Sequence, residues 1–164
     1  MVCAYCGFPG KSMSSHVFEY HLLHIRDLSG ERTVALNAAT YSVGRDSSNA
    51  LMIHDPTVSR LHCLLIRLPM NNKKYVYRLV DGNTQGRRSS NGSRVNSTIY
   101  AEKVLESRDL IQLGSESSLH YLIARMSPRE FEDYFGQAIV PFHSVQDEIL
   151  DPTQTLVTPE GLVA

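Results

Sequence analysis

Apolar residues recur in short runs between positions 18 and 126, and turn-forming residues separate these runs. Most runs are four to eight residues long and rich in β-branched and aromatic side chains. They cover residues 20–28, 32–36, 41–43, 50–53, 62–68, 75–80, 109–113 and 119–124. Apolar residues occupy both faces of 75–80, which indicates a strand covered on both sides. The pattern is typical of an all-β fold, an antiparallel β-sandwich or barrel.

One helix is predicted after these strands, over residues 127–143. Residues 127–130 (Ser-Pro-Arg-Glu) combine a capping serine, a proline at the first helical position and a glutamate three residues after the cap. Phe131, Phe135 and Ile139 then repeat every four residues, which gives the helix one apolar face.

The two ends of the chain differ from its middle. Residues 1–17 are mostly small, polar and turn-forming, and they include Cys3 and Cys6, so we predict a flexible arm. Residues 18–126 form the β domain. Residues 144–164 contain Pro, Thr, Gln and acidic residues but neither Lys nor Arg, which predicts an acidic disordered tail.

Length and composition indicate a soluble cytoplasmic protein. A chain of 164 residues suits one domain with tails, and 42% hydrophobic residues allow a packed core. Apolar runs stay well below the roughly 18–20 residues that a membrane span needs, and no secretory signal is evident. Three cysteines do not make a disulfide framework, which favours a reducing compartment.

Charge is divided unevenly along the chain. Lys and Arg number 16 and Asp and Glu 17, so the net charge is −1. Residues 1–126 hold 15 basic and 10 acidic residues, whereas residues 127–164 hold 1 and 7. We therefore expect a mildly basic domain beside an acidic tail, with no nucleic-acid or membrane partner.

Three short motifs lie on predicted loops of the β domain. They are Gly44-Arg45, residues 59–62 (Ser-Arg-Leu-His) and residues 90–96 (Ser-Asn-Gly-Ser-Arg-Val-Asn). Because a sandwich brings loops from distant segments to one end, we expect the three motifs to meet.

The residue types in these motifs suit an oxyanion. The guanidinium groups of Arg45 and Arg60 match a phosphate, and the hydroxyls of Ser59 and Ser90 add short donors. A phosphorylated residue presents about −1.5 to −2 charge and three acceptor oxygens. The Asn91 amide both donates and accepts, which suits an extended peptide backbone.

All three motifs, in order and with consistent spacing over about residues 20–126, resemble the forkhead-associated (FHA) domain. The resemblance implies an eleven-strand β-sandwich that binds phosphothreonine peptides through loops at one end. It assigns the phosphate contacts to Arg45, Ser59, Arg60 and Ser90, and the contact with the ligand backbone to Asn91.

The resemblance also implies residues that support the site. Gly44 and Gly92 look like turn residues, His62 like an internal brace of the binding loop, and Asn96 like a turn stabiliser. Residues 81–92 are longer than the usual family run and similar to the form in cyanobacterial FHA proteins. Within them we interpret Arg87 and Arg88 as a solvated loop that can steer acidic phosphopeptides. Ser93 stands where Thr is more usual.

Zinc binding is the first alternative. Cys3 and Cys6 form half of a zinc knuckle, and His21 and His24 follow them. The two histidines fall in a predicted strand, where positions three apart face opposite sides, so a four-ligand site would need distortion. We predict no metal in the β domain and leave metal binding by the two cysteines open.

Catalysis is the second alternative. Ser59, His62 and Asp81 are the residue types of a nucleophilic triad, but neither a Gly-x-Ser-x-Gly elbow nor a His-Glu-x-x-His helix is present. We therefore predict no catalytic residues, no enzymatic activity and no cofactor.

The predicted function is a phosphothreonine-peptide-binding adaptor that acts downstream of a Ser/Thr kinase. Its partner would be a phosphothreonine-containing protein or its own tail, where Thr153, Thr155 and Thr158 are candidate phosphorylation sites. Leu156 lies three residues after Thr153, and the resemblance implies that this position is often recognised. The alternative is a constitutive, phosphate-independent scaffold that uses the sandwich and the helix face.

Overall fold

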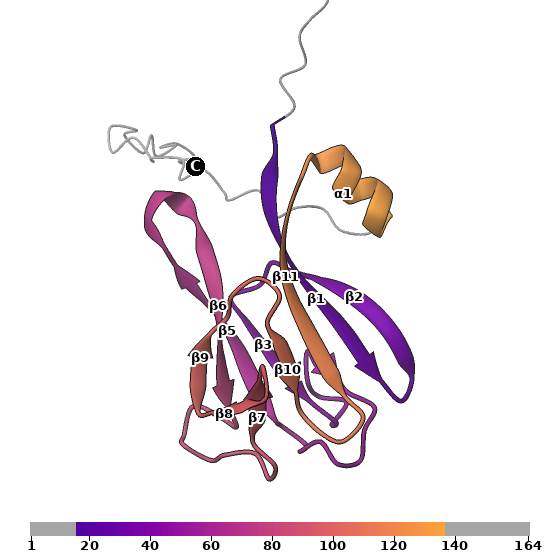
Figure 1. Cartoon of the computed structure of the whole chain (residues 1–164), viewed down its shortest axis with the longest axis vertical. Coiled ribbons are helices and arrows are strands. Elements are labelled where there is room, and N and C mark those ends of the chain that lie inside the picture. The colour runs from indigo at the N-terminus through magenta and orange to yellow at the C-terminus, as the bar shows by residue number, and fades with distance from the viewer. Residues whose placement is uncertain (1–15, 137–164) are drawn as a thin grey trace, which may run out of the picture.

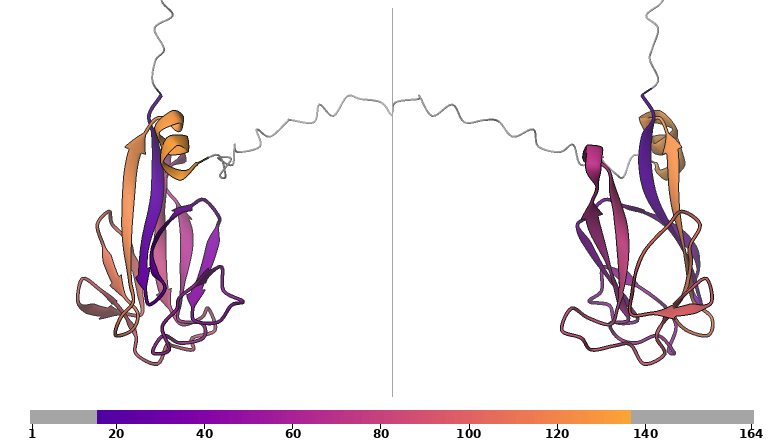
Figure 2. Two further views of the ribbon diagram at one scale, coloured as in Figure 1. Left: turned by 90° about the vertical axis from the view of Figure 1, so that its right-hand side faces the viewer. Right: turned by 60° about the vertical axis from the view of Figure 1, so that its left-hand side comes forward.

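The computed structural model describes residues 16–136 of the chain, and for Lys73 only the backbone. Eleven strands form two sheets that pack face to face, and one short helix follows (Figures 1 and 2). This confirms the predicted all-β sandwich. The predicted N-terminal arm with its two cysteines and the acidic tail lie outside the described residues, apart from the last residues of the arm.

The elements follow one another along the chain without a break in the β pattern. They are β1 (Phe18–Asp27), β2 (Gly30–Leu36), β3 (Thr40–Gly44), β4 (Leu51–Met52), β5 (Cys63–Pro69), the 3-10 turn η1 (Asn71–Lys73), β6 (Tyr75–Asp81), β7 (Ser93–Val95), β8 (Thr98–Tyr100), β9 (Glu102–Val104), β10 (Leu110–Gln112), β11 (Ser118–Met126) and α1 (Pro128–Phe135).

Each sheet mixes strands from distant parts of the sequence. The six-stranded sheet has the order β2-β1-β11-β10-β7-β8, and the five-stranded sheet has the order β4-β3-β5-β6-β9. β3 and β4 pair in parallel, and the other described pairs are antiparallel. β1 pairs with β11 from Phe18 opposite Met126 to Arg26 opposite Ser118, which joins the first strand to the last.

The core lies between the two sheets and contains inward-facing side chains of the strands. Its largest fully buried side chains include Leu23, Ile25, Leu65, Tyr77, Leu79, Ile111, Leu119 and Tyr121. Burial of such apolar surface is the main force that holds a sandwich together.

The expectation that β6 is covered on both sides is wrong. Tyr77 and Leu79 are fully buried, but Val76 and Val80 on the other face are only half-buried. The helix packs on β1 rather than on β6, because the Phe131 ring stacks on Tyr20 at 4.1 Å between ring centroids.

Three strands of three residues each, β7, β8 and β9, were not expected from the apolar pattern. They are short and mostly polar, so no apolar run marks them. The turn between β7 and β8 holds Asn96 and Ser97, with φ of 49° and 72°. Positive φ at two successive residues gives the tight hairpin turn that matches the twist of the strands.

The start of α1 is as predicted. The Ser127 hydroxyl accepts a hydrogen bond from the Glu130 amide, and the Glu130 carboxylate accepts one from the Ser127 amide. The helix ends at Phe135, because Gly136 takes a φ of 71°. It is therefore shorter than the predicted 127–143, whose last residues, from 137 on, lie outside the described part.

His21 lies in an aromatic cluster at the end of the sandwich near α1. Its side chain is buried, its Nδ1 atom contacts the Tyr121 hydroxyl, and its ring stacks on Tyr75 at 4.3 Å. Burial disfavours the charged ring and lowers the pKa of His21 to about 4. The ring is therefore neutral in the folded protein at neutral pH.

His21 should make the domain sensitive to mild acid. As the pH falls, His21 takes up a proton in the unfolded chain near its ordinary pKa of 6.5, before it does so in the folded protein. The contribution of His21 to the free energy of unfolding is therefore fully present above pH 6.5 and is lost as the pH falls toward 4. We expect a loss of about 3 kcal/mol from this residue between pH 7 and pH 4. Urea unfolding at several pH values should show a shallower pH dependence for His21→Gln, and parallel curves for the two proteins would contradict this assignment.

Candidate functional site

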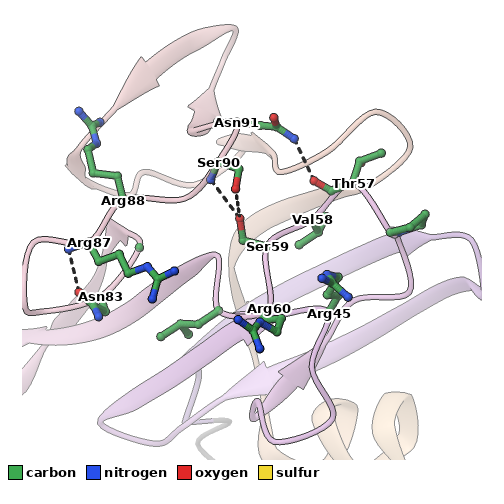
Figure 3. Close-up of a pocket in the computed structure, with 13 residues that line it drawn as sticks. Arg45, Thr57, Val58, Ser59, Arg60, Asn83, Arg87, Arg88, Ser90 and Asn91 are labelled. Carbon is green, nitrogen blue, oxygen red and sulfur yellow. Dashed lines mark hydrogen bonds between the residues drawn. The ribbon is translucent and has the colours of Figure 1, made fainter.

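A pocket of about 610 Å³ opens at the end of the sandwich opposite α1 (Figures 1 and 3). Three loops surround it: the segment after β3, the β4–β5 loop and the β6–β7 loop. The structure brings together all five predicted contact residues. The lining residues are Arg45, Pro56, Thr57, Val58, Ser59, Arg60, Leu61, Gly82, Asn83, Arg87, Arg88, Ser90 and Asn91.

His62 lies under the pocket and connects its loops. Its backbone amide donates to the Val43 carbonyl at 2.8 Å, and its carbonyl accepts from the Gly82 amide at 2.7 Å. Its Nδ1 atom accepts from the Ser59 amide at 3.2 Å, and its Nε2 atom lies 3.4 Å from the Gly92 carbonyl. One fully buried residue thus contacts four residues in the segments around the site.

The hydrogen bonds of His62 define its protonation state. Nδ1 must be unprotonated to accept from the Ser59 amide, and Nε2 carries the proton that points to the Gly92 carbonyl. Burial lowers the pKa of His62, and the bond to Gly92 opposes this only in part. The buried ring is therefore held as one neutral tautomer. Its position fits the internal brace that the family resemblance implies.

Asp81 fixes the β6–β7 loop from below. Its buried carboxylate accepts from the Ser89 hydroxyl at 2.6 Å, the Ser89 amide at 3.2 Å and the Ser93 hydroxyl at 2.8 Å. Burial alone would raise the pKa of Asp81, but these bonds outweigh it and hold the pKa below its usual value. The ionised carboxylate thereby positions the segment that carries Ser90 and Asn91.

Asp55 fixes the β4–β5 loop in the same way, through hydrogen bonds to its carboxylate. Its carboxylate accepts from the Thr57 amide at 2.8 Å, the Thr57 hydroxyl at 2.6 Å and the Ser117 hydroxyl at 2.8 Å. Asn91 then reaches across from the β6–β7 loop, where its side-chain amide donates to the Thr57 carbonyl at 2.9 Å. The two loops are thus joined at the mouth of the pocket (Figure 3).

Ser59 and Ser90 form a second bridge between the same loops. The Ser90 amide donates to the Ser59 hydroxyl at 3.0 Å, and the two hydroxyl oxygens lie 3.4 Å apart. Ser90 is exposed and Ser59 half-buried, so both hydroxyls can face a ligand.

Gly44 allows the segment after β3 to lie close to the β4–β5 loop. A Cβ atom there would lie 2.1 Å from the Arg60 carbonyl oxygen, so a larger residue would push the two segments apart. The Arg45 amide donates to the Ser59 carbonyl at 3.1 Å, directly beside this contact. Close backbone approach, rather than a turn, is therefore the structural reason for glycine at position 44.

Asn83 orders an additional turn, residues 83–87, within the long β6–β7 loop. Its side-chain oxygen accepts from the amides of Gln85 at 3.0 Å and Arg87 at 2.9 Å, and its own amide donates to the Arg87 carbonyl at 2.9 Å. Gly82 precedes it with a φ of 78°, and a Cβ atom at that position would lie 1.8 Å from the Arg87 carbonyl oxygen.

This turn places Arg87 and Arg88 in the lining of the pocket. The sequence interpretation made them part of a solvated loop, and both are indeed exposed, but they also belong to the site. The signal that was missed is the asparagine four residues before Arg87, since an Asn side chain often closes a turn on nearby backbone amides.

Asn96 and Gly92 lie beside the pocket rather than in its lining. Asn96 is in the β7–β8 turn, where its side chain donates to the Asp109 carboxylate at 2.7 Å and accepts from the Leu110 amide at 3.0 Å. Gly92 takes a φ of 71° next to Asn91. Both positions match the structural roles that the resemblance implies.

Positive charge dominates the pocket. Four arginines, Arg45, Arg60, Arg87 and Arg88, are among the lining residues, and no Asp or Glu is. Arg88 lies 3.4 Å from the Asp81 carboxylate. Within residues 16–136, the other three guanidinium groups have no carboxylate at ion-pair distance. The arrangement is therefore chemically suited to an anion.

Comparison with known proteins identifies the domain. The FHA domain family matches residues 41–114. An uncharacterized protein of Synechocystis sp. is 30% identical over 102 residues, which are 62% of this chain and 15% of that protein. The chain thus spans a small part of the length of this curated relative.

Solved structures agree with this identification. The Slr1951 protein from Synechocystis sp. is 32% identical, with a TM-score of 0.60, over 62% of this chain and 96% of that one. A structure from an analysis of phosphothreonine-dependent FHA domain interactions is 28% identical, with a TM-score of 0.52, over 64% and 97% of the two chains. The chain belongs to the FHA domain family, as the sequence motifs indicated.

The structure separates the two histidines of the zinc alternative. Within residues 16–136, no three His, Cys, Asp or Glu side chains are grouped so that they could hold a metal ion. His21 is buried against Tyr121, whereas His24 contacts Thr33 on the opposite face of β1. The same part of the chain has no helix that could cross a membrane.

Replacing His62 by alanine should destabilise the domain. The change leaves the Ser59 amide and the Gly92 carbonyl without their partner and opens a cavity, so we expect a loss of about 2–4 kcal/mol. Thermal or urea unfolding measures it, with His120→Ala, at a half-buried position on β11, as the matched control. Equal stability of the two variants would show that His62 is not a brace.

Proposed function

We propose that this domain is a non-catalytic module that binds phosphothreonine peptides in Ser/Thr kinase signalling. The observation that carries the proposal is a pocket in which three loops present arginines and hydroxyls, with no carboxylate among the lining residues. Such a set of donors matches the charge and the three acceptor oxygens of a phosphoryl group.

The phosphate contacts are proposed on the side chains that are free to make them. Arg45 and Arg60 are exposed and reach the pocket from the segment after β3 and from the β4–β5 loop. Ser59 and Ser90 lie to one side of these two arginines and offer hydroxyl donors (Figure 3). The neighbouring bonds through His62 and Asp81 hold these donors in place before a ligand arrives, which lowers the entropy lost on binding.

Asn91 is proposed to hold the backbone of the ligand. Its side-chain nitrogen already donates to the Thr57 carbonyl. Its side-chain oxygen makes no hydrogen bond with another described residue, and the residue is exposed. That oxygen can accept from an amide of an extended peptide that lies over the two serines.

The comparisons support this function at the level of the family. One similar structure comes from work on phosphothreonine-dependent FHA domain interactions. By analogy, the partner here would be a protein that an upstream Ser/Thr kinase has phosphorylated on threonine. A cytoplasmic location fits such a partner.

A phosphate-independent scaffold is the alternative function. It would need an unoccupied apolar helix face, but Phe131 is buried, stacks on Tyr20 and contacts the tilted ring of Phe135. The apolar face of α1 therefore serves the packing of the domain itself. Ile139, the third residue of the predicted face, lies outside the described residues.

Arg45→Ala and Ser59→Ala should each weaken binding of a phosphothreonine peptide without unfolding the sandwich. Loss of one charge-assisted hydrogen bond costs about 1.5–3 kcal/mol, or about 10- to 150-fold in Kd. Calorimetry against a phosphothreonine peptide library measures this, with unphosphorylated and phosphoserine peptides as ligand controls. Arg129→Ala on the remote helix is the matched protein control.

The outcomes separate the two functions. Binding of a phosphothreonine peptide that disappears without the phosphate supports the proposal. A partner that binds equally well after phosphatase treatment, and is indifferent to Arg45→Ala, would identify the scaffold function instead.

The protein's own tail is a proposed partner of the site. Thr153, Thr155 and Thr158 lie in residues 144–164, outside the described part, and that segment carries acidic but no basic residues. If a phosphorylated tail competes for the pocket, deletion of residues 144–164 from kinase-treated protein should raise the affinity for an added phosphothreonine peptide. Unchanged affinity would remove the tail as a competitor.

A further inference from the structure

We propose that Arg87 forms a second anion subsite in the pocket, beside the proposed phosphate contacts Arg45 and Arg60, and that it recognises a second acidic group on the same peptide. The group is a carboxylate or a second phosphate. This inference rests on the proposed phosphothreonine function and extends it, because it assigns a role to the additional turn at residues 83–87 that none of the three sequence motifs contains.

The direction of the Arg87 side chain is the first argument. Figure 3 shows Arg87 extending from the turn into the pocket, toward Arg60 and Ser59, while the adjacent Arg88 points away from them. Arg45 lies on the far side of Arg60. The pocket therefore has cationic groups along its length, with the two serines near its middle.

The rigidity of the turn is the second argument. Four hydrogen bonds that involve Asn83 close it, and two of them reach the backbone of Arg87. The close contact of Gly82 with the Arg87 carbonyl fixes the entry to the turn. Because its backbone is held in this way, Arg87 loses less freedom on binding an anion than an arginine on an unstructured loop would.

Charge balance is the third argument. One phosphorylated residue brings about −1.5 to −2 charge. Arg88 is beside Asp81, and Asp46 interacts electrostatically with Arg45 and Arg60. Within residues 16–136, Arg87 has no carboxylate at ion-pair distance. A single phosphothreonine that engages Arg45 and Arg60 thus leaves one guanidinium unmatched in the same pocket. A ligand with a second anion neutralises that group.

The geometry of an extended peptide indicates where the second anion should lie. An extended peptide advances about 3.3 Å per residue. A group two to four residues from the phosphothreonine is therefore roughly 7–13 Å away, beyond the first phosphate but close enough to share the pocket. Because the direction of the peptide is not fixed by the apo structure, both sides of the phosphothreonine are included in the test.

The experiment is a binding scan with the full chain. A phosphothreonine peptide with alanine at all other positions is the parent, and Asp, Glu or phosphoserine is placed singly at each position from −4 to +4. We expect a gain of about tenfold or more in affinity at one or two positions with wild-type protein. Comparison of the Asp, Glu and phosphoserine series shows whether the subsite prefers a carboxylate or a phosphate.

Arg87→Ala should abolish this gain, measured as the ratio of the affinities for the acidic peptide and the parent peptide. Arg94→Ala removes the same charge from an exposed position on β7 that does not line the pocket and is the matched control, in which the gain should persist. Arg87→Lys should retain part of the gain, since the charge remains while the planar guanidinium is lost.

Two results would overturn the subsite. One is a parent peptide that binds although no position gives a gain, and the other is a gain that survives Arg87→Ala. If no phosphothreonine peptide binds at all, the proposed function fails, and the subsite fails with it.

Discussion

The candidate site depends on one buried, neutral imidazole. His62 uses its backbone amide, its backbone carbonyl and both ring nitrogens to contact Val43, Gly82, Ser59 and Gly92. No other side chain type offers an acceptor and a donor on opposite edges of a rigid ring. The loops of a sandwich are its most mobile parts, so a site built from three of them requires such a shared support.

Two carboxylates support the same loops, and their burial separates negative charge from the ligand side. Asp55 and Asp81 accept hydrogen bonds from serine and threonine hydroxyls and from backbone amides, and they are buried under the loops. The four arginines, by contrast, line the pocket itself. The loops are thus held by ionised acids while the surface that meets a ligand remains cationic.

Much of the fold could be predicted from the sequence, because the longer strands alternate apolar and polar residues and face a common core. The motif residues Arg45, Ser59 and Ser90 were expected to meet, and the structure brings them together. What was missed depends on interactions between distant segments. The short strands β7, β8 and β9 exist because they pair with neighbours, and their own residues carry little β signal.

Arg87 shows the same limit within the site. In the sequence it is one of two adjacent arginines in a polar loop, and such residues are usually solvated. Only the hydrogen bonds of Asn83 and the contact at Gly82 distinguish the two by turning Arg87 into the pocket and Arg88 away. The direction of a loop side chain follows from backbone geometry, which residue identity alone does not specify.

The net charge of −1 therefore says little about what the domain can bind. Exposed charges act over about 8–10 Å at physiological ionic strength, so a ligand in the pocket experiences the nearby arginines and little of the rest of the chain. The lining residues supply four arginines and no acid, while the Asp81 carboxylate is buried and hydrogen-bonded to serines. Asp46, which interacts electrostatically with Arg45 and Arg60, is not among the lining residues. Affinity for an anion is thus set by the turns that aim Arg45, Arg60 and Arg87. A substitution that breaks the hydrogen bonds of Asn83 would therefore change the selectivity for anionic ligands more than a substitution elsewhere that alters only the total charge.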